Sequence, residues 1–219
     1  MRQMNKRQMS KRQMSKIQIK ICGLRREEDI KYVNECLPEY IGFVFAESKR
    51  KVDKKQAKVL KEMLSSKIQA VGVFVNAALE EIEELCSENV IDIVQLHGEE
   101  DIVYIESLRE RISNPIIKAI RVRSQEQILE EEKMPCEMLL LDTYTKGEYG
   151  GSGKDFDLQM IPELEKPYFL AGGLQVETIK EKLAQVNPYA VDISSGVETD
   201  GIKDFQKIKE FVKKIREER

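Results

Sequence analysis

Two ionisable side chains stand where predicted strands end in this sequence. Cys22 follows the alternating apolar segment that begins at Ile17, and Asp142 closes the apolar run that begins at Met138. In a parallel barrel, the carboxyl ends of the strands form the face at which substrates bind. A thiol and a carboxylic acid that meet on this face can act as a general base and a general acid.

Glycine and serine gather at the ends of the last two predicted strands, as Gly172-Gly173 and as Ser194-Ser195-Gly196. Backbone N–H groups at these positions of a barrel often hold a phosphate, together with the N-terminus of a short extra helix. We therefore expect a substrate that carries a phosphate group.

Arg50 and His97 follow two other strands at the same face. Arg50 comes after the second predicted strand and can form a bidentate pair with a substrate carboxylate. Its neighbours Lys49 and Lys51 leave open the alternative that all three are solvated surface charges. His97 follows the fourth predicted strand, and it could either contact the substrate or cap a turn.

Strand-like and helix-like segments alternate along the chain, which predicts a parallel sheet with crossover helices. The predicted strands are 17–22, 41–45, 69–75, 91–96, 115–121, 138–142, 167–171 and 189–194. The helix-like stretches between and after them include 27–36, 53–64, 78–86, 101–111, 176–184 and 204–215. An open doubly wound sheet would place a glycine-rich phosphate loop after its first strand, and the first turn has no such pattern. We therefore predict one (β/α)8 TIM barrel over residues 17–219.

The alternation of side chains along a strand places Lys20 and Cys22 on the barrel interior, and it does the same for Asp192 and Ser194. Closure of the barrel brings strand eight beside strand one, so that Lys20 and Asp192 should form a buried pair. Lys20 could also lower the pKa of Cys22. The alternative for Cys22 is a small buried apolar residue without chemistry.

Asp142 shares its predicted face with Leu140 and Met138. This apolar surrounding should raise the pKa of its carboxyl group and favour a general acid, whereas the alternative is a helix cap or turn residue. The glycine-rich run 143–154 that follows predicts either a lid or a long surface loop.

The 219 residues are 41% hydrophobic, which suits a single large core. Residues 1–16 hold six of the 36 basic residues and no acidic one, in a repeated low-complexity pattern that we interpret as a disordered tail. The rest of the chain has 30 basic against 39 acidic side chains, so that we expect no nucleic-acid partner.

The cysteines at 22, 36, 86 and 136 form no CxxC pair, and His97 is the one histidine. This pattern supports neither a metal site nor a disulfide framework. No segment approaches the roughly 18 apolar residues of a membrane span, and we expect a protein of the reducing cytoplasm without a membrane partner.

Taken in order, these segments resemble the phosphoribosylanthranilate isomerase family of tryptophan biosynthesis. The motifs that carry the resemblance are 20–23 (KICG), 41–45 (IGFVF), 48–50 (SKR), 71–76 (VGVFVN), 94–98 (VQLHG), 140–143 (LLDT), 150–154 (GGSGK), 170–174 (LAGGL) and 191–198 (VDISSGVE). The resemblance implies an aldose–ketose isomerase that performs an Amadori rearrangement without a metal or organic cofactor.

The resemblance also implies a role for each group. Asp142 would be the general acid and Cys22 the general base, and Arg50 would hold the anthranilate carboxylate. The backbone around Gly172, Gly173, Ser195 and Gly196 would hold the phosphate.

Two other functions are weighed against this one. A bifunctional sugar isomerase of the histidine and tryptophan pathways shares the barrel, but it has an aspartate where Cys22 stands. A non-catalytic barrel that binds a phosphosugar could have lost the acid or the base, whereas this chain has both. The sequence is compatible with a monomer and with a homodimer.

Overall fold

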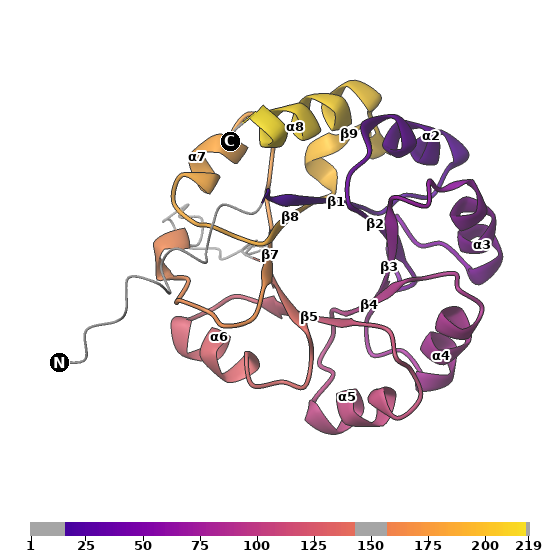
Figure 1. Cartoon of the computed structure of the whole chain (residues 1–219), viewed down its shortest axis with the longest axis vertical. Helices are drawn as coiled ribbons and strands as arrows, with labels where there is room; N and C mark the ends of the chain where they lie inside the picture. The colour runs from indigo at the N-terminus through magenta and orange to yellow at the C-terminus, as the bar shows by residue number, and fades with distance from the viewer. Residues whose placement is uncertain (1–15, 143–156, 218–219) are drawn as a thin grey trace.

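The computed structural model describes residues 16–142 and 157–217, which form a closed barrel of eight parallel strands in sequence order (Figure 1). The strands are β1 (Gln18–Cys22), β2 (Tyr40–Val44), β3 (Gln69–Phe74), β4 (Ile93–Leu96), β5 (Ile116–Arg121), β6 (Met138–Asp142), β7 (Tyr168–Ala171) and β8 (Ala190–Ile193). Pairing of β1 with β8 closes the barrel. The predicted TIM barrel is confirmed, and the open sheet is excluded.

Helices surround the barrel on its outside (Figure 1). They are α2 (Glu27–Cys36), α3 (Lys54–Met63), α4 (Leu79–Ser87), α5 (Ile102–Arg109), α6 (Gln125–Glu131), α7 (Ile179–Leu183) and α8 (Phe205–Glu217). Short elements complete the chain: the 3-10 turns η1 (Leu158–Met160) and η2 (Ser195–Val197), and a hairpin of β9 (Glu198–Thr199) and β10 (Ile202–Lys203). None of the helices in this part of the chain is both long and apolar enough to span a membrane.

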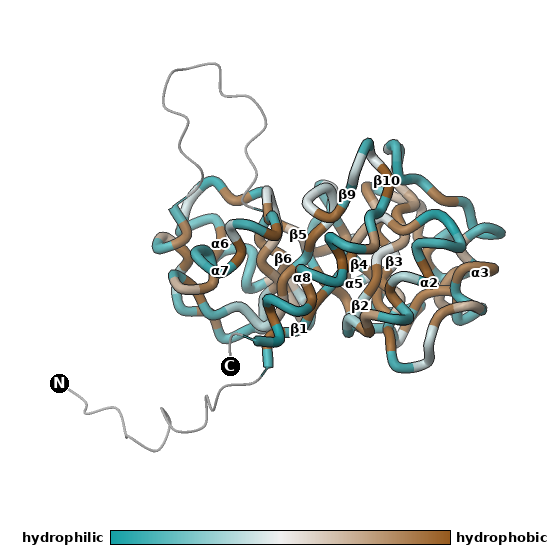
Figure 2. Tube along the Cα trace, turned by 90° about the horizontal axis from the view of Figure 1, so that it is seen from above, coloured by the Kyte–Doolittle hydropathy of each residue, from teal (hydrophilic) through white to brown (hydrophobic). Residues whose placement is uncertain are grey.

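Alternation along the strands divides the core into two layers. Ile19 and Ile21 belong to the layer between the sheet and the helices, as do Leu139 and Leu141. Residues of opposite parity, such as Leu140, fill the barrel interior. The outer layer is closed by helices whose apolar residues recur on one face. Helix α8 shows this recurrence as alternating apolar and hydrophilic stretches along its chain (Figure 2). Its buried residues are Ile208, Phe211, Val212 and Ile215.

The predicted disordered tail and the predicted lid over 143–154 lie outside the described residues, apart from Lys16 at the end of the tail. The carboxyl ends of all eight strands, from Cys22 to Ile193, lie at one face of the barrel.

Candidate active site

A cavity of about 660 Å³ opens at the carboxyl ends of the strands. Cys22, Asp142, Arg50 and His97 all line it, so that four side chains predicted from separate strands meet in one place. Its wall also includes Arg121, Gln95, Asp192 and the segments 171–175 and 194–195.

Cys22 ends β1 and is only 9% exposed. Its thiol lies against the backbone of β2, where a Cβ atom on Gly42 would come within 2.6 Å of Cys22 Sγ. Residue 42 must therefore be glycine for the thiol to occupy this position.

The buried pair beneath Cys22 is confirmed. Lys20 is fully buried, and its Nζ donates to Asp192 Oδ2 at 2.8 Å and to Gln95 Oε1 at 2.9 Å. These acceptors balance the charge of an ammonium group that would otherwise be costly to bury.

Burial and nearby charges act in opposite directions on the pKa of the Cys22 thiol. Burial raises this pKa, and the lowering effect of the nearby Lys20 and Lys203 ammonium groups is smaller than the effect of burial. The predicted lowering effect of Lys20 is confirmed, but the net pKa is raised because the thiol is deeply buried. The protonated thiol predominates at neutral pH.

His97 lies next to Asp142, with 3.6 Å between His97 Nε2 and Asp142 Oδ2. On its other side, His97 Nδ1 is 3.1 Å from Gln95 Nε2. The orientation of the Gln95 amide follows from Lys20, because an ammonium can only donate and must face the amide oxygen. The amide nitrogen therefore donates to Nδ1, and neutral His97 has its proton on Nε2, the nitrogen that faces Asp142.

Arg50 already has a carboxylate partner within the protein. Its Nε and Nη2 donate to Glu198 Oε1 and Oε2, each at 2.7 Å. A guanidinium can also bind a carboxylate through the edge formed by its two Nη atoms. Only this second edge can be used for the predicted bidentate pair with a substrate.

Gly23 leaves space for the side chain of Arg50. A Cβ atom at residue 23 would lie 2.4 Å from Arg50 Cδ, and the φ of +83° at this residue also favours glycine.

The predicted phosphate residues divide into two groups. Gly172, Gly173 and Ser195 line the cavity. The Ser194 hydroxyl also reaches the cavity wall, but it donates to the carbonyl oxygen of Cys22 at 3.0 Å and so links β8 to β1. Gly196 lies behind this wall, next to the carbonyl of Leu174.

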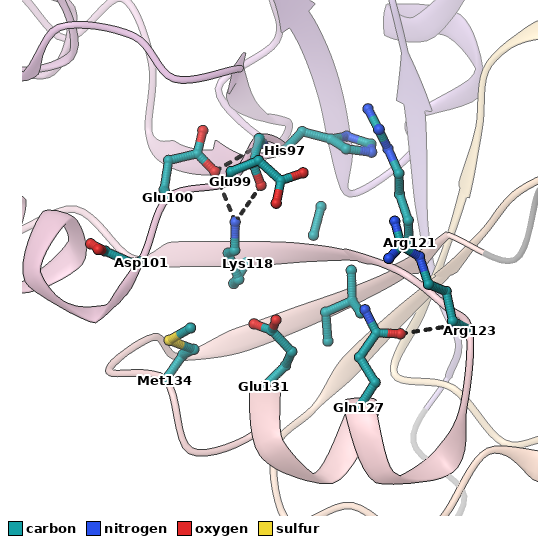
Figure 3. A pocket seen from close by; sticks show the side chains of 13 residues that line it. His97, Glu99, Glu100, Asp101, Lys118, Arg121, Arg123, Gln127, Glu131 and Met134 are labelled. Atoms are coloured by element: carbon teal, nitrogen blue, oxygen red, sulfur yellow. Dashed lines mark hydrogen bonds and ion pairs between the residues drawn. The ribbon is translucent and has the colours of Figure 1, made fainter.

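A smaller cavity of about 250 Å³ lies beside the first, between the ends of β4 and β5 and helix α6 (Figure 3). His97 and Arg121 line both cavities. Within the smaller one, buried Lys118 donates to Gly98 O and to Glu100 Oε2, each at 2.8 Å. These contacts fix the loop that carries His97.

The ion pairs of Glu198 make the stability of the folded protein depend on pH. Burial alone raises its pKa, but the hydrogen bonds from Arg50 and Lys203 outweigh burial and lower the pKa from 4.5 to about 2. The ionised carboxylate therefore stabilises the folded protein above about pH 4.5, and this stabilisation disappears as the pH falls toward 2.

We expect Glu198→Gln to lower the free energy of unfolding by roughly 3 kcal/mol at neutral pH, the equivalent of a shift of this size. Urea unfolding of both proteins between pH 7 and pH 3 should show this difference shrinking with acid. A difference that stays constant with pH would contradict the assigned ion pairs.

The model of the N-(5'-phosphoribosyl)anthranilate isomerase family matches residues 19–214, which is most of the chain. The chain belongs to this family. Among curated relatives, the N-(5'-phosphoribosyl)anthranilate isomerase of Endomicrobium trichonymphae is 50% identical over 199 residues, covering 91% of this chain and 98% of the relative. The isomerase of Lachnoclostridium phytofermentans is 47% identical, covering 90% and 96%. The family and the isomerase activity predicted from the sequence are confirmed.

Solved isomerases have the same barrel. The phosphoribosyl anthranilate isomerase of Thermotoga maritima matches with a TM-score of 0.77 and 36% identity over 91% of this chain and 98% of its own. A second solved isomerase, in complex with reduced 1-(o-carboxyphenylamino)-1-deoxyribulose 5-phosphate, matches with a TM-score of 0.75 and 33% identity, covering 90% and 97%.

Sequence reasoning missed several polar residues of this isomerase site. Arg121 is paired in register with Asp142 at the ends of neighbouring strands. It lies two residues after Ala119, which is in the barrel interior, so that alternation along the strand could have predicted the same side for Arg121. Glu198 and Lys203 had no comparable signal, because they lie on a two-residue hairpin after the last strand of the barrel.

Proposed function

We propose that this isomerase converts N-(5-phosphoribosyl)anthranilate to 1-(2-carboxyphenylamino)-1-deoxyribulose 5-phosphate, with Asp142 as general acid and Cys22 as general base. The observation that supports these roles is the single cavity into which both groups open from the ends of β6 and β1. A substrate bound there can meet an acid and a base on different sides of its sugar.

In the first step, Asp142 gives its proton to the oxygen of the furanose ring. The bond between C1 and this oxygen breaks as the nitrogen lone pair forms a C1=N bond, so that the product is an open-chain iminium. In the second step, Cys22 removes the proton from C2, and the electron pair of that C–H bond forms a C1=C2 enolamine. Tautomerisation of the enolamine gives the aminoketone, and no atoms are gained or lost.

Cys22 can act as this base only as the thiolate, which its raised pKa makes scarce at neutral pH. The same high pKa makes the thiolate that does form a strong base toward a carbon acid. The ammonium groups of Lys20 and Lys203 favour the thiolate over the thiol. The iminium next to C2 further acidifies the proton to be removed.

Two charged groups of the substrate would be bound apart from the reacting carbons. The N–H groups around Gly172, Gly173 and Ser195 are suited to the phosphate, and Arg50 is suited to the anthranilate carboxylate. A solved relative contains a ligand with both of these groups. Because all four cysteines are free and Cys22 must stay reduced, we place the enzyme in the cytoplasm.

The activity is tested by following the loss of anthranilate-type fluorescence when purified protein meets phosphoribosylanthranilate generated in situ. The substrate is labile, so that the Asp142→Asn protein is run as the control. Rapid loss with the intact protein alone supports the proposal. Rates with both proteins that do not exceed the spontaneous loss without protein would favour a barrel that only binds phosphosugars.

Arg50→Ala should mainly raise KM, by about tenfold or more, and change kcat little. The anthranilate carboxylate is charged in the substrate and in the transition state alike, so that its partner contributes uniform binding. Steady-state kinetics of the purified variant measure both constants. A variant with normal KM and low kcat would remove Arg50 from carboxylate binding.

A further inference from the structure

Glu198 joins the loop after β2 to the hairpin that follows β8. Its side chain is 6% exposed and accepts two hydrogen bonds from Arg50, on the loop after β2. It also accepts from Lys203 Nζ at 2.7 Å, and the Lys203 side chain is 1% exposed. The other contacts of Lys203 Nζ are the carbonyl and hydroxyl oxygens of Ser194, at 2.9 and 3.4 Å.

The hairpin of β9 and β10 fixes this arrangement. Its register places Lys203 directly opposite Glu198. The backbone beside it is anchored as well, because Arg26 Nη2 donates to Lys203 O at 3.3 Å and Asp204 N donates to Val197 O at 2.9 Å. Glu198 therefore presents its carboxylate to Arg50 from a fixed support.

Arg50 has no comparable support of its own. It lies on a loop, and its side chain is 31% exposed. A long side chain in this setting has many rotamers, and holding it in one geometry lowers the entropy lost when a ligand binds. The bidentate pair with Glu198 holds the Nε edge of Arg50 and leaves the edge formed by the two Nη atoms for a ligand in the cavity.

We propose that Glu198, supported by Lys203, is a positioning residue that orients Arg50 for the arylcarboxylate of the substrate and thereby contributes to specificity for an ortho-carboxylated aniline. This proposal rests on the proposed function, because it takes the carboxylate to be the ligand of Arg50. If Glu198 acted on Arg50 through its charge alone, its removal would strengthen binding of the carboxylate, because Glu198 partly neutralises Arg50. If Glu198 positions Arg50, its removal should weaken that binding.

The test compares two ligands in binding titrations: reduced 1-(o-carboxyphenylamino)-1-deoxyribulose 5-phosphate and the same compound without the ring carboxylate. The variants are Glu198→Gln, which removes the charge, and Glu198→Asp, which keeps the charge but is too short to reach Arg50 and Lys203 in the same geometry. We expect both to weaken binding of the carboxylated ligand by about tenfold and to leave Kd of the other ligand nearly unchanged.

Glu137→Gln is the matched control. Glu137 also pairs with an arginine, Arg109, but it precedes β6 and so lies at the opposite end of the barrel. This variant should leave both Kd values at the wild-type level.

Equal weakening of both ligands by the Glu198 variants would assign Glu198 a purely structural role and overturn the proposal. Tighter binding of the carboxylated ligand to Glu198→Gln, with a normal Glu198→Asp, would overturn it in favour of charge alone. Failure of the underlying function has a different signature: the wild-type protein would then bind the two ligands equally well or fail to isomerise the substrate.

Discussion

Asp142→Asn should lower kcat by about 10²–10⁴-fold, the usual contribution of a general acid. Asparagine has nearly the same shape as aspartate but carries no acidic proton for the ring oxygen of the substrate. His97, 3.6 Å away, has no role in this transfer if Asp142 is the acid, so that it should not restore activity. Single-turnover fluorescence measurements on the purified variant give the rate of the chemical step directly.

Binding of the reduced product analogue separates this chemical effect from a damaged site. Its Kd should change by less than about threefold, because the contacts proposed for the phosphate and the carboxylate do not involve Asp142. If the variant turned over at a near-normal rate, Asp142 would not be the acid, and the turn-residue interpretation would stand.

Cys22→Ser should also reduce kcat strongly, by about 10³-fold or more. The hydroxyl fits the space beside Gly42 that the thiol occupies, but it yields an anion at neutral pH far less readily than a thiol does. Proton removal from C2 should therefore become the slow step. A substrate deuterated at C2 should show a clear isotope effect on kcat with this variant.

The control for this prediction is Cys36→Ser, the same substitution at a half-buried cysteine in α2, away from the cavity lining. It should have wild-type kinetics. A Cys22→Ser enzyme with normal kcat, or one without an isotope effect on a slow reaction, would indicate that another group removes the proton.

Much of the fold could be predicted because the strands have a clear chemical pattern. The predicted strand 138–142 coincides with β6, and 17–22 differs from β1 by one residue. Helix α6 was not among the named helices, because Ile128 is its one buried residue and no apolar period marks it. Its start is nevertheless visible in the sequence, since Ser124 caps it by accepting a hydrogen bond from Gln127 N.

The candidate site could be predicted where it depends on alternation and closure. Those two rules placed Cys22 on the interior and paired Lys20 with Asp192, as the structure has them. Alternation gives the direction of a side chain but not the depth of its burial. The lowering effect of Lys20 on the Cys22 pKa could therefore be predicted, but not the larger opposing effect of burial.

The ion pair between Arg50 and Glu198 could not be predicted from the sequence, for a different reason. These residues are 148 positions apart, and both lie outside the regular strands of the barrel. Their meeting depends on the paths of a loop and a hairpin, which no periodic pattern in the sequence describes.

The pairing of β1 with β8, which closes the barrel, also determines when the enzyme can become active during its synthesis on the ribosome. Cys22 is made early, but its neighbours Asp192, Ser194 and Lys203 are among the last residues of the barrel to emerge. A nascent chain that has already exposed both the acid and the base therefore still lacks the electrostatic surroundings of its thiol. Activity should begin abruptly, when the final strand and its hairpin dock, rather than grow as the polypeptide lengthens.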